Sequence, residues 1–257
     1  MNRYADANGQ NADSLQEARC VALAQNRRGH GQSTLAWYLG RALAAMRIRT
    51  LIVDITGRHG RLAALAASEP VRNLGVWAPS PARVAHLPAL LQAVRQQTRG
   101  KVDVILLDCD VAALENAGGF AAGVDYLLVL IDPTETGQKT AEHLAERLGD
   151  APPPMGRLGV VFSRVNASEA ESVPQQTEDR HLPVLGYFPA DYLLAGDESS
   201  QRPGATPAVP HDDYLLAAQR LARALVGHAQ LRRASSSPSP EPLQPIQKVA
   251  MDGRVEA

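Results

Sequence analysis

The chain has 257 residues, with 26 lysines and arginines against 27 aspartates and glutamates, and a formal net charge of −1. This balance excludes a globally basic nucleic-acid binder, so any non-specific contact with nucleic acid would need a local basic patch. Two cysteines exclude a disulfide framework and a cysteine-rich zinc module. No apolar run approaches the roughly 18 residues that a membrane span needs, and the polar first residues lack a signal peptide's apolar core. We therefore expect a cytoplasmic protein.

The two ends of the chain differ in composition from its middle. Residues 1–17 are polar and carry too few apolar side chains to offset the entropy of ordering, which predicts a disordered leader. Residues 231–257 are rich in serine and proline, which predicts a flexible tail. The middle, residues 18–230, is expected to form one domain.

Short apolar runs and helical patterns alternate through this middle part. The runs lack polar alternation, as is typical of strands buried on both faces, and they lie at residues 20–24, 50–53, 74–77, 102–107, 126–131, 158–162 and 184–188. Leu35, Leu39 and Leu43 form an apolar stripe on a helix after the first run. A second stripe, which predicts a long final helix, is formed by Leu215, Leu216, Ala218, Leu221, Ala222 and Leu225. The pattern predicts an α/β fold with a single doubly wound, mostly parallel seven-stranded sheet and helices on both faces.

The segment 26–34 follows the first predicted strand and opens the first predicted helix. Gly29 and Gly31 let the backbone approach an anion, and the helix start supplies free N–H groups and the positive end of a dipole. Ser33 offers a hydroxyl that could bind Mg²⁺. This is the context of a phosphate-binding loop, although an ordinary glycine-containing turn explains the same residues. Ligands of such sheets bind beyond the carboxyl ends of the strands, so we expect the functional site there.

Six motifs occur in a characteristic order along the chain: GHGQST at 29–34, TLIVD at 50–54, VDVILLD at 102–108, VDYLLVL at 124–130, LGVVFSRV at 158–165 and PVLGYFPAD at 183–191. Together they resemble the MinD/ParA group of deviant P-loop ATPases, including its bacterial tyrosine-kinase and polysaccharide-export branch. The resemblance covers about residues 18–228 and implies a P-loop ATPase fold. It implies nucleotide binding by Arg27, Arg28, Gly29, Gly31, Gln32, Ser33, Thr34, Ser163 and Pro189, and, where nucleotide binds, Mg²⁺ binding by Ser33, Asp54 and Asp108.

The departures from the family pattern concern its charged groups. Gln32 replaces the P-loop lysine, and an amide cannot neutralise charge on a transferred phosphoryl group. Thr56 replaces a second carboxylate, and Ser163 replaces the asparagine expected to read adenine. Arg27 stands where the family has a lysine that crosses the dimer, and Arg27 or Arg28 could compensate in part. Loss of both catalytic charges should leave little turnover, so we assign no catalytic residue and treat ATP and Mg²⁺ as candidate cofactors only.

Two functions follow from the resemblance and its departures. The first is a degenerate, non-hydrolysing protein that acts by binding. It would position or regulate a cell-envelope, polysaccharide (exopolysaccharide or cellulose) or partitioning machine, or pair with an active homologous ATPase. The second is a slow but genuine ATPase switch that dimerises on nucleotide, with Arg27 or Arg28 replacing the lysine. The first predicts a monomer or weak dimer, with a partner such as a polysaccharide synthase or export component that recruits it to the inner membrane.

The two cysteines and a group of arginines are the remaining candidate residues. Cys20 and Cys109 lie at opposite ends of the predicted sheet and should not pair; Cys20 is expected to be a packed thiol. Two interpretations explain the four arginines Arg27, Arg28, Arg58 and Arg61. They could form an anion site for nucleotide, a nucleic-acid backbone or an acidic partner, or they could form a solvated basic rim.

Overall fold

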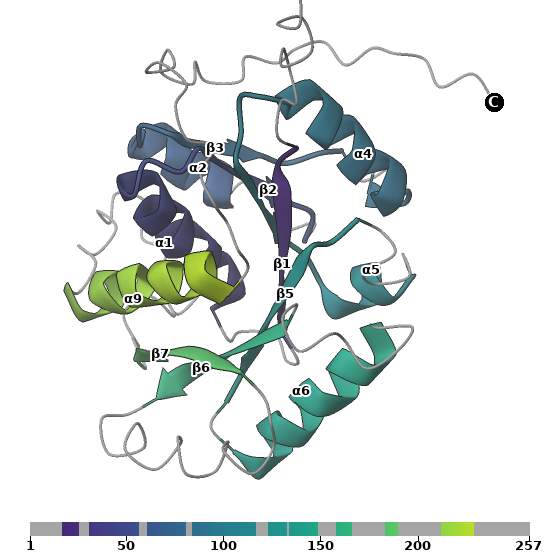
Figure 1. The fold of residues 1–257 in the computed structure, drawn as a ribbon, viewed down its shortest axis with the longest axis vertical. Coiled ribbons are helices and arrows are strands. Elements are labelled where there is room, and N and C mark those ends of the chain that lie inside the picture. Colours follow the sequence, from purple (N-terminus) through teal and green to yellow (C-terminus); the bar gives the residue numbers. More distant parts are fainter. Residues whose placement is uncertain are drawn as a thin grey trace, which may run out of the picture.

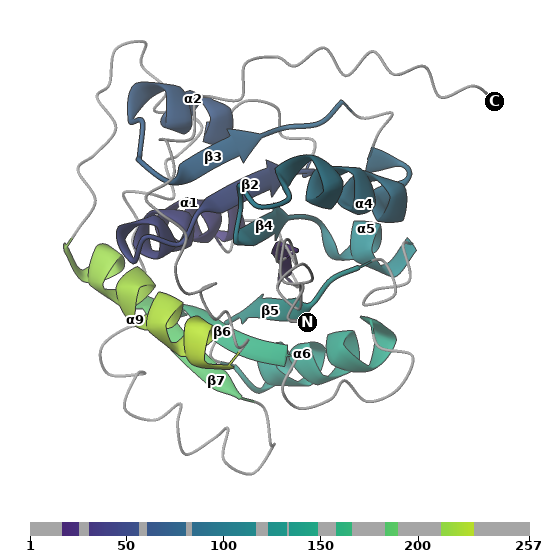
Figure 2. The same ribbon diagram turned by 45° about the horizontal axis from the view of Figure 1, so that its top comes forward.

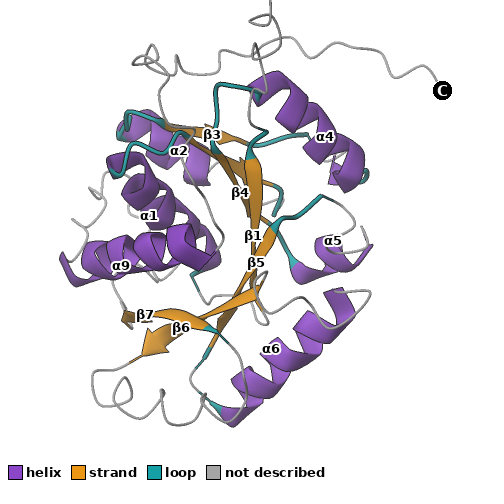
Figure 3. Cartoon of the chain, in the orientation of Figure 1, coloured by secondary structure: helices purple, strands orange, loops and turns teal. Residues whose placement is uncertain are grey.

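A computed structural model describes residues 17–25, 31–56, 61–80, 84–116, 123–132, 134–148, 158–165, 183–189 and 212–228. Strands and helices alternate along most of the chain, as the sequence predicted (Figure 1, Figure 3). In chain order the elements are β1 (Arg19–Gln25), α1 (Gln32–Ala45), β2 (Thr50–Asp54), α2 (Arg61–Ser68), β3 (Leu74–Trp77), α4 (Leu87–Thr98), β4 (Val104–Asp108), α5 (Val111–Asn116), β5 (Tyr126–Ile131), α6 (Glu135–Leu148), β6 (Leu158–Val165), β7 (Val184–Pro189) and α9 (Asp212–His228).

The seven strands form one parallel sheet in the order β3-β2-β4-β1-β5-β6-β7. Helices α1, α2 and α9 cover one face, and α4, α5 and α6 cover the other (Figure 1, Figure 2). This arrangement confirms the predicted fold class. Because β1 lies between β4 and β5, the chain connections diverge there, and the carboxyl ends of β1, β2 and β4 meet at one edge. In an open parallel sheet this switch point is where ligands bind.

The strands have the composition that burial on both faces requires. Every residue of β2, β4 and β5 is buried, and these strands consist mainly of leucine, isoleucine and valine. Leu35, Leu39 and Leu43 are also buried, as the helical stripe predicted, and they pack α1 against the sheet.

Five predicted strands have different boundaries in the structure, and two of them, β4 and β6, differ by more than one residue at one end. β4 begins at Val104 rather than residue 102, because the backbone N–H groups of Val102 and Asp103 donate to Thr98 and Arg49 instead of to a neighbouring strand. β6 continues to Val165, and its register with β7 is irregular over its last residues.

One residue of the predicted α9 stripe is misplaced. Leu216 is 44% exposed, whereas Tyr214, Ala218, Leu221 and Leu225 are buried. Leu216 is two residues from both Tyr214 and Ala218, or about 200° around a helix, so it faces away from the sheet. The helix begins at Asp212, so the acidic pair at 212–213 forms its first residues.

Several predictions concern residues outside the described ranges. They include the tail 231–257, residues 1–16 of the leader, and Arg27, Arg28, Gly29 and Arg58. Glu17, the last residue of the predicted leader, is described and lies 3.7 Å from Arg95. Among the helices that the structure describes, none combines the length and apolar character of a membrane span.

The edge of the sheet where the strands begin, called the amino edge here, holds two arginine–aspartate pairs. In the first, Arg49 binds the Asp103 carboxylate through both its guanidinium and its backbone N–H, the latter at 2.8 Å. The same guanidinium also donates to the Gly100 carbonyl. Arg49 and Asp103 therefore join the starts of β2 and β4.

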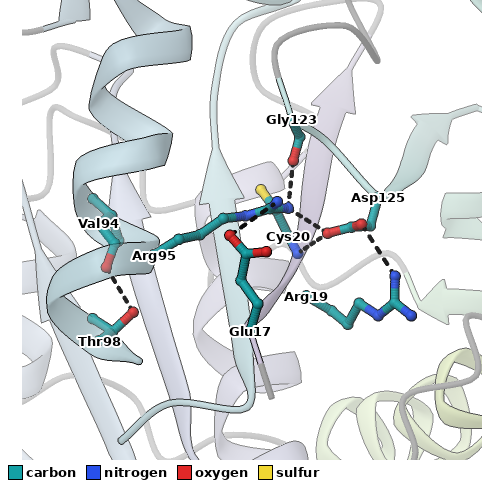
Figure 4. Close-up of polar contacts among 8 residues, drawn as sticks. All are labelled: Glu17, Arg19, Cys20, Val94, Arg95, Thr98, Gly123 and Asp125. Atoms are coloured by element: carbon teal, nitrogen blue, oxygen red, sulfur yellow. Dashed lines mark hydrogen bonds and ion pairs between the residues drawn. The ribbon is translucent and has the colours of Figure 1, made fainter. Parts of the chain in front are cut away.

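The second pair joins α4 to the start of β5 (Figure 4). Arg95 donates to the Asp125 carboxylate and to the Gly123 carbonyl. Asp125 also accepts the backbone N–H of Cys20 at 2.8 Å and a contact from Arg19 at 3.3 Å. The aspartate at this position thus binds both an arginine and the backbone of the central strand.

Candidate functional site

Gln32, the first residue of α1, turns its side chain toward the ends of β1 and β4. Its Nε2 lies 2.8 Å from the Leu23 carbonyl oxygen, 2.6 Å from Asp108 Oδ1 and 2.8 Å from the Cys109 carbonyl oxygen. A carboxamide has only two N–H hydrogens, so three acceptors share two donors. Gln32 is 3% exposed, and its Oε1 has no hydrogen-bond partner in the described structure.

The backbone just before Gln32 explains this orientation. Gly31 is the N-cap residue of α1 and has φ +83°, in the left-handed region that glycine adopts without a steric penalty. Its carbonyl accepts the Leu35 N–H at 2.7 Å, which starts the helical hydrogen bonds. Side chains of a helix tilt toward its N-terminus, so the residue after Gly31 points back at the sheet edge.

Two aspartates lie side by side at this edge. Asp54 and Asp108 are register partners at the last positions of β2 and β4, and both are buried. Asp54 Oδ1 accepts the Thr56 backbone N–H at 3.1 Å and the Thr56 hydroxyl at 2.7 Å. Within the described residues, neither aspartate forms an ion pair. We call Gln32, Ser33, Asp54, Thr56 and Asp108 the carboxyl-edge cluster.

Burial determines the protonation of Asp108. It raises the pKa of Asp108 from 3.8 to about 7, and the charges of Asp54 and Asp110 add to this effect. Hydrogen bonds from Ser33 and Gln32 act in the opposite direction and lower the pKa. Asp108 Oδ2 has no hydrogen-bond partner in the part that the structure describes. A proton on that atom would convert an unpaired acceptor into a donor.

The carboxyl-edge cluster contains ligands of the kind that Mg²⁺ prefers. Ser33, Asp54 and Asp108 offer one hydroxyl and two carboxylates, and Asp108 Oδ2 is unpaired. Mg²⁺ is usually held by one or two carboxylates together with substrate phosphates and water. Among the described residues, no three or more His, Cys, Asp or Glu side chains gather into a metal site. The residues therefore suit Mg²⁺ that arrives with phosphate oxygens rather than a metal held by protein alone.

The structure brings some of the predicted site residues together and not others. Gly31, Gln32 and Ser33 lie with Asp54, Thr56 and Asp108 at the carboxyl edge, and Thr34 follows in the first turn of α1. Ser163 lies on β6, which β5 separates from β1, and its buried hydroxyl is 3.4 Å from the Ile131 carbonyl oxygen. Pro189 ends β7 at the same side of the sheet.

Sequence reasoning missed two features of the cluster. The carbonyl oxygens of Leu23 and Cys109, which accept from Gln32, are backbone atoms and carry no sequence signal. Gln25 ends β1, and its buried Oε1 also has no partner within the described ranges. A polar residue that closes an apolar strand directly before a glycine-containing loop is the signal that could have identified it.

The two cysteines are both buried, and neither forms a disulfide. Burial raises the pKa of Cys20 to about 12, and burial likewise raises that of Cys109. A reactive cysteine needs an accessible, stabilised thiolate, so both are packed thiols. The prediction that they do not pair is confirmed.

No family model and no curated protein matches the chain. Solved structures do match it. A chain of the MinC:MinD cell division protein complex from Aquifex aeolicus is 17% identical, with a TM-score of 0.56, over 88% of this chain and 99% of that one. This chain has the MinD/ParA-like ATPase fold.

Two other matching structures contain nucleotide. The septum site-determining protein MinD from Pyrococcus horikoshii, in complex with Mg-ADP, is 18% identical with a TM-score of 0.58, over 81% of this chain and 96% of that one. A plasmid partition protein from Borrelia burgdorferi bound to AMPPNP is 13% identical with a TM-score of 0.54, over 82% of this chain and 99% of that one. At such identities the likeness establishes the fold and leaves the activity to be argued from the residues.

Proposed function

We propose that this protein is a catalytically degenerate member of the MinD/ParA-like fold that acts by binding and does not hydrolyse ATP. The observation that carries the proposal is the state of Gln32. This residue occupies the position of the P-loop lysine in the motif, carries no charge, and binds its own chain through Leu23, Asp108 and Cys109.

Phosphoryl transfer depends almost entirely on positioning and on neutralising negative charge in the transition state. Gln32 supplies no positive charge for this purpose. Thr56 supplies a hydroxyl where the family motif has a second carboxylate, and that hydroxyl is already bound to Asp54. Removing one such group typically lowers the rate by about 10²–10³. The parts of the motif that build the fold are thus present, whereas the charge of the P-loop lysine and that of the second carboxylate are absent.

A protein that binds without turnover has to act through a partner. The A. aeolicus structure is a complex of MinD with a second protein, MinC, which supports a protein partner for this chain as well. We propose that the partner belongs to a cell-envelope, polysaccharide or partitioning machine, or is an active homologous ATPase. The chain would then be a monomer or weak dimer that its partner brings to the inner membrane.

One observation favours the alternative, a slow ATPase switch. Ser33, Asp54 and Asp108 retain the oxygen atoms that would bind Mg²⁺, and Asp108 Oδ2 is unpaired. In this alternative Arg27 or Arg28 would replace the lysine, and ATP would drive dimerisation.

Turnover by the purified full-length chain tests the proposal. We expect Mg²⁺-dependent ATP hydrolysis to be indistinguishable from a buffer control, and light scattering to show no dimerisation on adding Mg-ATP. The double variant Gln32→Lys, Thr56→Asp should gain turnover. Gln92→Lys, the same charge change on an exposed position of α4, should not. Robust hydrolysis by the unmodified chain, or ATP-driven dimerisation, would favour the ATPase switch.

A further inference from the structure

The carboxyl edge offers different contacts to the two ends of a polyphosphate. We propose that this site takes a nucleoside diphosphate with Mg²⁺ in preference to a triphosphate, and that Gln32 is the residue that determines this specificity. The inference rests on the proposed function, binding without hydrolysis, and names the ligand class of that same site.

The contacts available to the inner phosphates come from backbone atoms. The first N–H groups of a helix have no partner within the helix, and α1 is 14 residues long. Its N-cap, Gly31, has no side chain that could occupy them. In phosphate-binding loops these backbone groups hold the α- and β-phosphates, whereas the loop lysine reaches the β- and γ-phosphates. Replacement of the lysine by Gln32 therefore leaves the backbone contacts of α1 to a diphosphate in place. It removes a side-chain contact that a triphosphate would make through two phosphates and a diphosphate through one.

The contact available to a third phosphate is the one that is lost. The Gln32 amide is neutral, and its Nε2 already serves three oxygens at 2.6–2.8 Å. Within the described residues, the Gln32 atom without a hydrogen-bond partner is Oε1, an acceptor, which cannot bind a phosphate oxygen. A third phosphate would find no donor on this side chain.

A third phosphate would also add negative charge beside Asp54 and Asp108. Both are buried at the ends of adjacent strands, and in the described part of the chain no lysine or arginine forms an ion pair with either. Like charges at close range in a buried site repel strongly. The less charged nucleotide is accordingly the better fit.

Two buried oxygens that have no hydrogen-bond partner among the described residues indicate that a ligand belongs at this edge. A 2.6 Å hydrogen bond joins Gln32 Nε2 to Asp108 Oδ1, and the two oxygens are the remaining polar atoms of these side chains, Gln32 Oε1 and Asp108 Oδ2. Buried acceptors without partners are rare in folded proteins. A cation carried in by a diphosphate would satisfy Asp108, while the charge at the edge stays lower than with a triphosphate.

Calorimetric titration of the full-length chain with Mg-ADP and with Mg-AMPPNP tests this preference. We expect Mg-ADP to bind about tenfold more tightly, the size of one hydrogen bond to a charged group. Gln32→Lys should abolish or reverse the preference by strengthening AMPPNP binding. Gln92→Lys, on exposed α4, is the matched control and should leave both affinities unchanged. Equal or tighter binding of AMPPNP by the unmodified chain overturns the proposal.

A second variant keeps the test informative if Gln32→Lys does not fold. Gln32→Met retains the length and removes the amide without adding a charge, so it should not strengthen AMPPNP binding relative to Mg-ADP as Gln32→Lys does. A tenfold loss of ADP affinity in this variant would place Gln32 in direct contact with the diphosphate and overturn its assigned role. Failure to bind either nucleotide also overturns this inference, whereas ATP turnover or ATP-driven dimerisation overturns the proposed function.

Discussion

The aspartates at the two edges of the sheet have opposite surroundings. At the amino edge, Asp103 and Asp125 each bind an arginine guanidinium and a backbone N–H. At the carboxyl edge, Asp54 and Asp108 lie deeper, have no ion pair within the described residues, and leave Asp108 Oδ2 unpaired.

This contrast separates stability from function. A partly buried carboxylate with an arginine and a backbone donor holds elements together, whereas a buried carboxylate without a compensating charge costs stability. Uncompensated groups with strongly shifted pKa values occur most often where a protein binds or transforms a ligand. The amino edge therefore stabilises the fold, and the carboxyl edge gives up stability to keep a site.

The largest expected effect is the pH dependence that Asp108 imposes on stability. Its pKa is raised from 3.8 to about 7 in the folded chain, so the folded state holds this proton more tightly than the unfolded state does. The contribution of this bound proton to the free energy of unfolding is fully present below pH 4, declines as pH rises, and is lost above pH 7. Three pKa units correspond to at most about 4 kcal/mol.

Asp108→Asn should remove this dependence. The difference in unfolding free energy between the variant and the unmodified chain, measured by urea denaturation, should therefore grow in favour of the variant from pH 5 to pH 8. Asp110→Asn, a half-buried neighbour, separates the loss of one negative charge from the loss of the buried carboxyl. A constant difference across pH would contradict the idea that the carboxyl edge is uncompensated.

Asp125→Ala tests the opposite edge. It leaves Arg95, whose side chain is only 15% exposed, with only the more distant Glu17 carboxylate at 3.7 Å, and it removes the acceptor of the Cys20 N–H. We expect a loss of about 2–3 kcal/mol in unfolding free energy. Glu69→Ala, which breaks the more exposed pair with Arg41, is the control and should cost under about 1 kcal/mol. Equal losses would mean that the amino edge is no more than a set of surface pairs.

Gln32→Lys should make the carboxyl edge resemble the amino edge. An ammonium has three hydrogens for the three oxygens that now share two, and its charge would compensate Asp108. After the cost of burying the ammonium is subtracted, we expect the free energy of unfolding to rise by about 1 kcal/mol at pH 8 and to depend less on pH. A lower stability with the pH dependence unchanged would show that the side chain does not reach Asp108.

The smallest expected effect is at the rim of the amino edge. Arg19 is 49% exposed and touches Asp125 at 3.3 Å, so Arg19→Ala should change the unfolding free energy by less than about 0.5 kcal/mol. Comparison with Asp125→Ala in the same denaturation series would then locate the stabilising part of the cluster at Arg95. A loss as large as that of Asp125→Ala would reassign it to Arg19.

The sheet could be predicted from sequence because its signal is local. Buried parallel strands are short apolar runs, and two of them, β3 and β5, have the predicted boundaries. The start of β4 was misjudged because Val102 is apolar yet bonds back to the helix before it. Apolar character alone does not show where a backbone N–H finds its acceptor.

The carboxyl-edge cluster was predictable in its members and not in its contacts. The motifs identify Gln32, Asp54, Thr56 and Asp108. That Gln32 binds Asp108 and two backbone carbonyls depends on strands far apart in sequence, and no spacing rule reports it. The absence of an ion pair at Asp108 among the described residues could not be inferred either, because ion pairing at an edge depends on which side chains the fold brings there.

The position of β1 has a consequence for how the protein is made. β1 is among the first elements to leave the ribosome, yet its partners are β4 and β5, with Arg19 beside Val104 and Val21 beside Tyr126. Contacts so distant along the chain slow folding, because the intervening loop must close before they form. Until β5 has been synthesised, the apolar strand β1 lacks a partner on that side and is prone to aggregation. The contacts of Gln32 with Asp108 and Cys109 also cannot form before β4 pairs with β1, so the site assembles only after the centre of the sheet has formed.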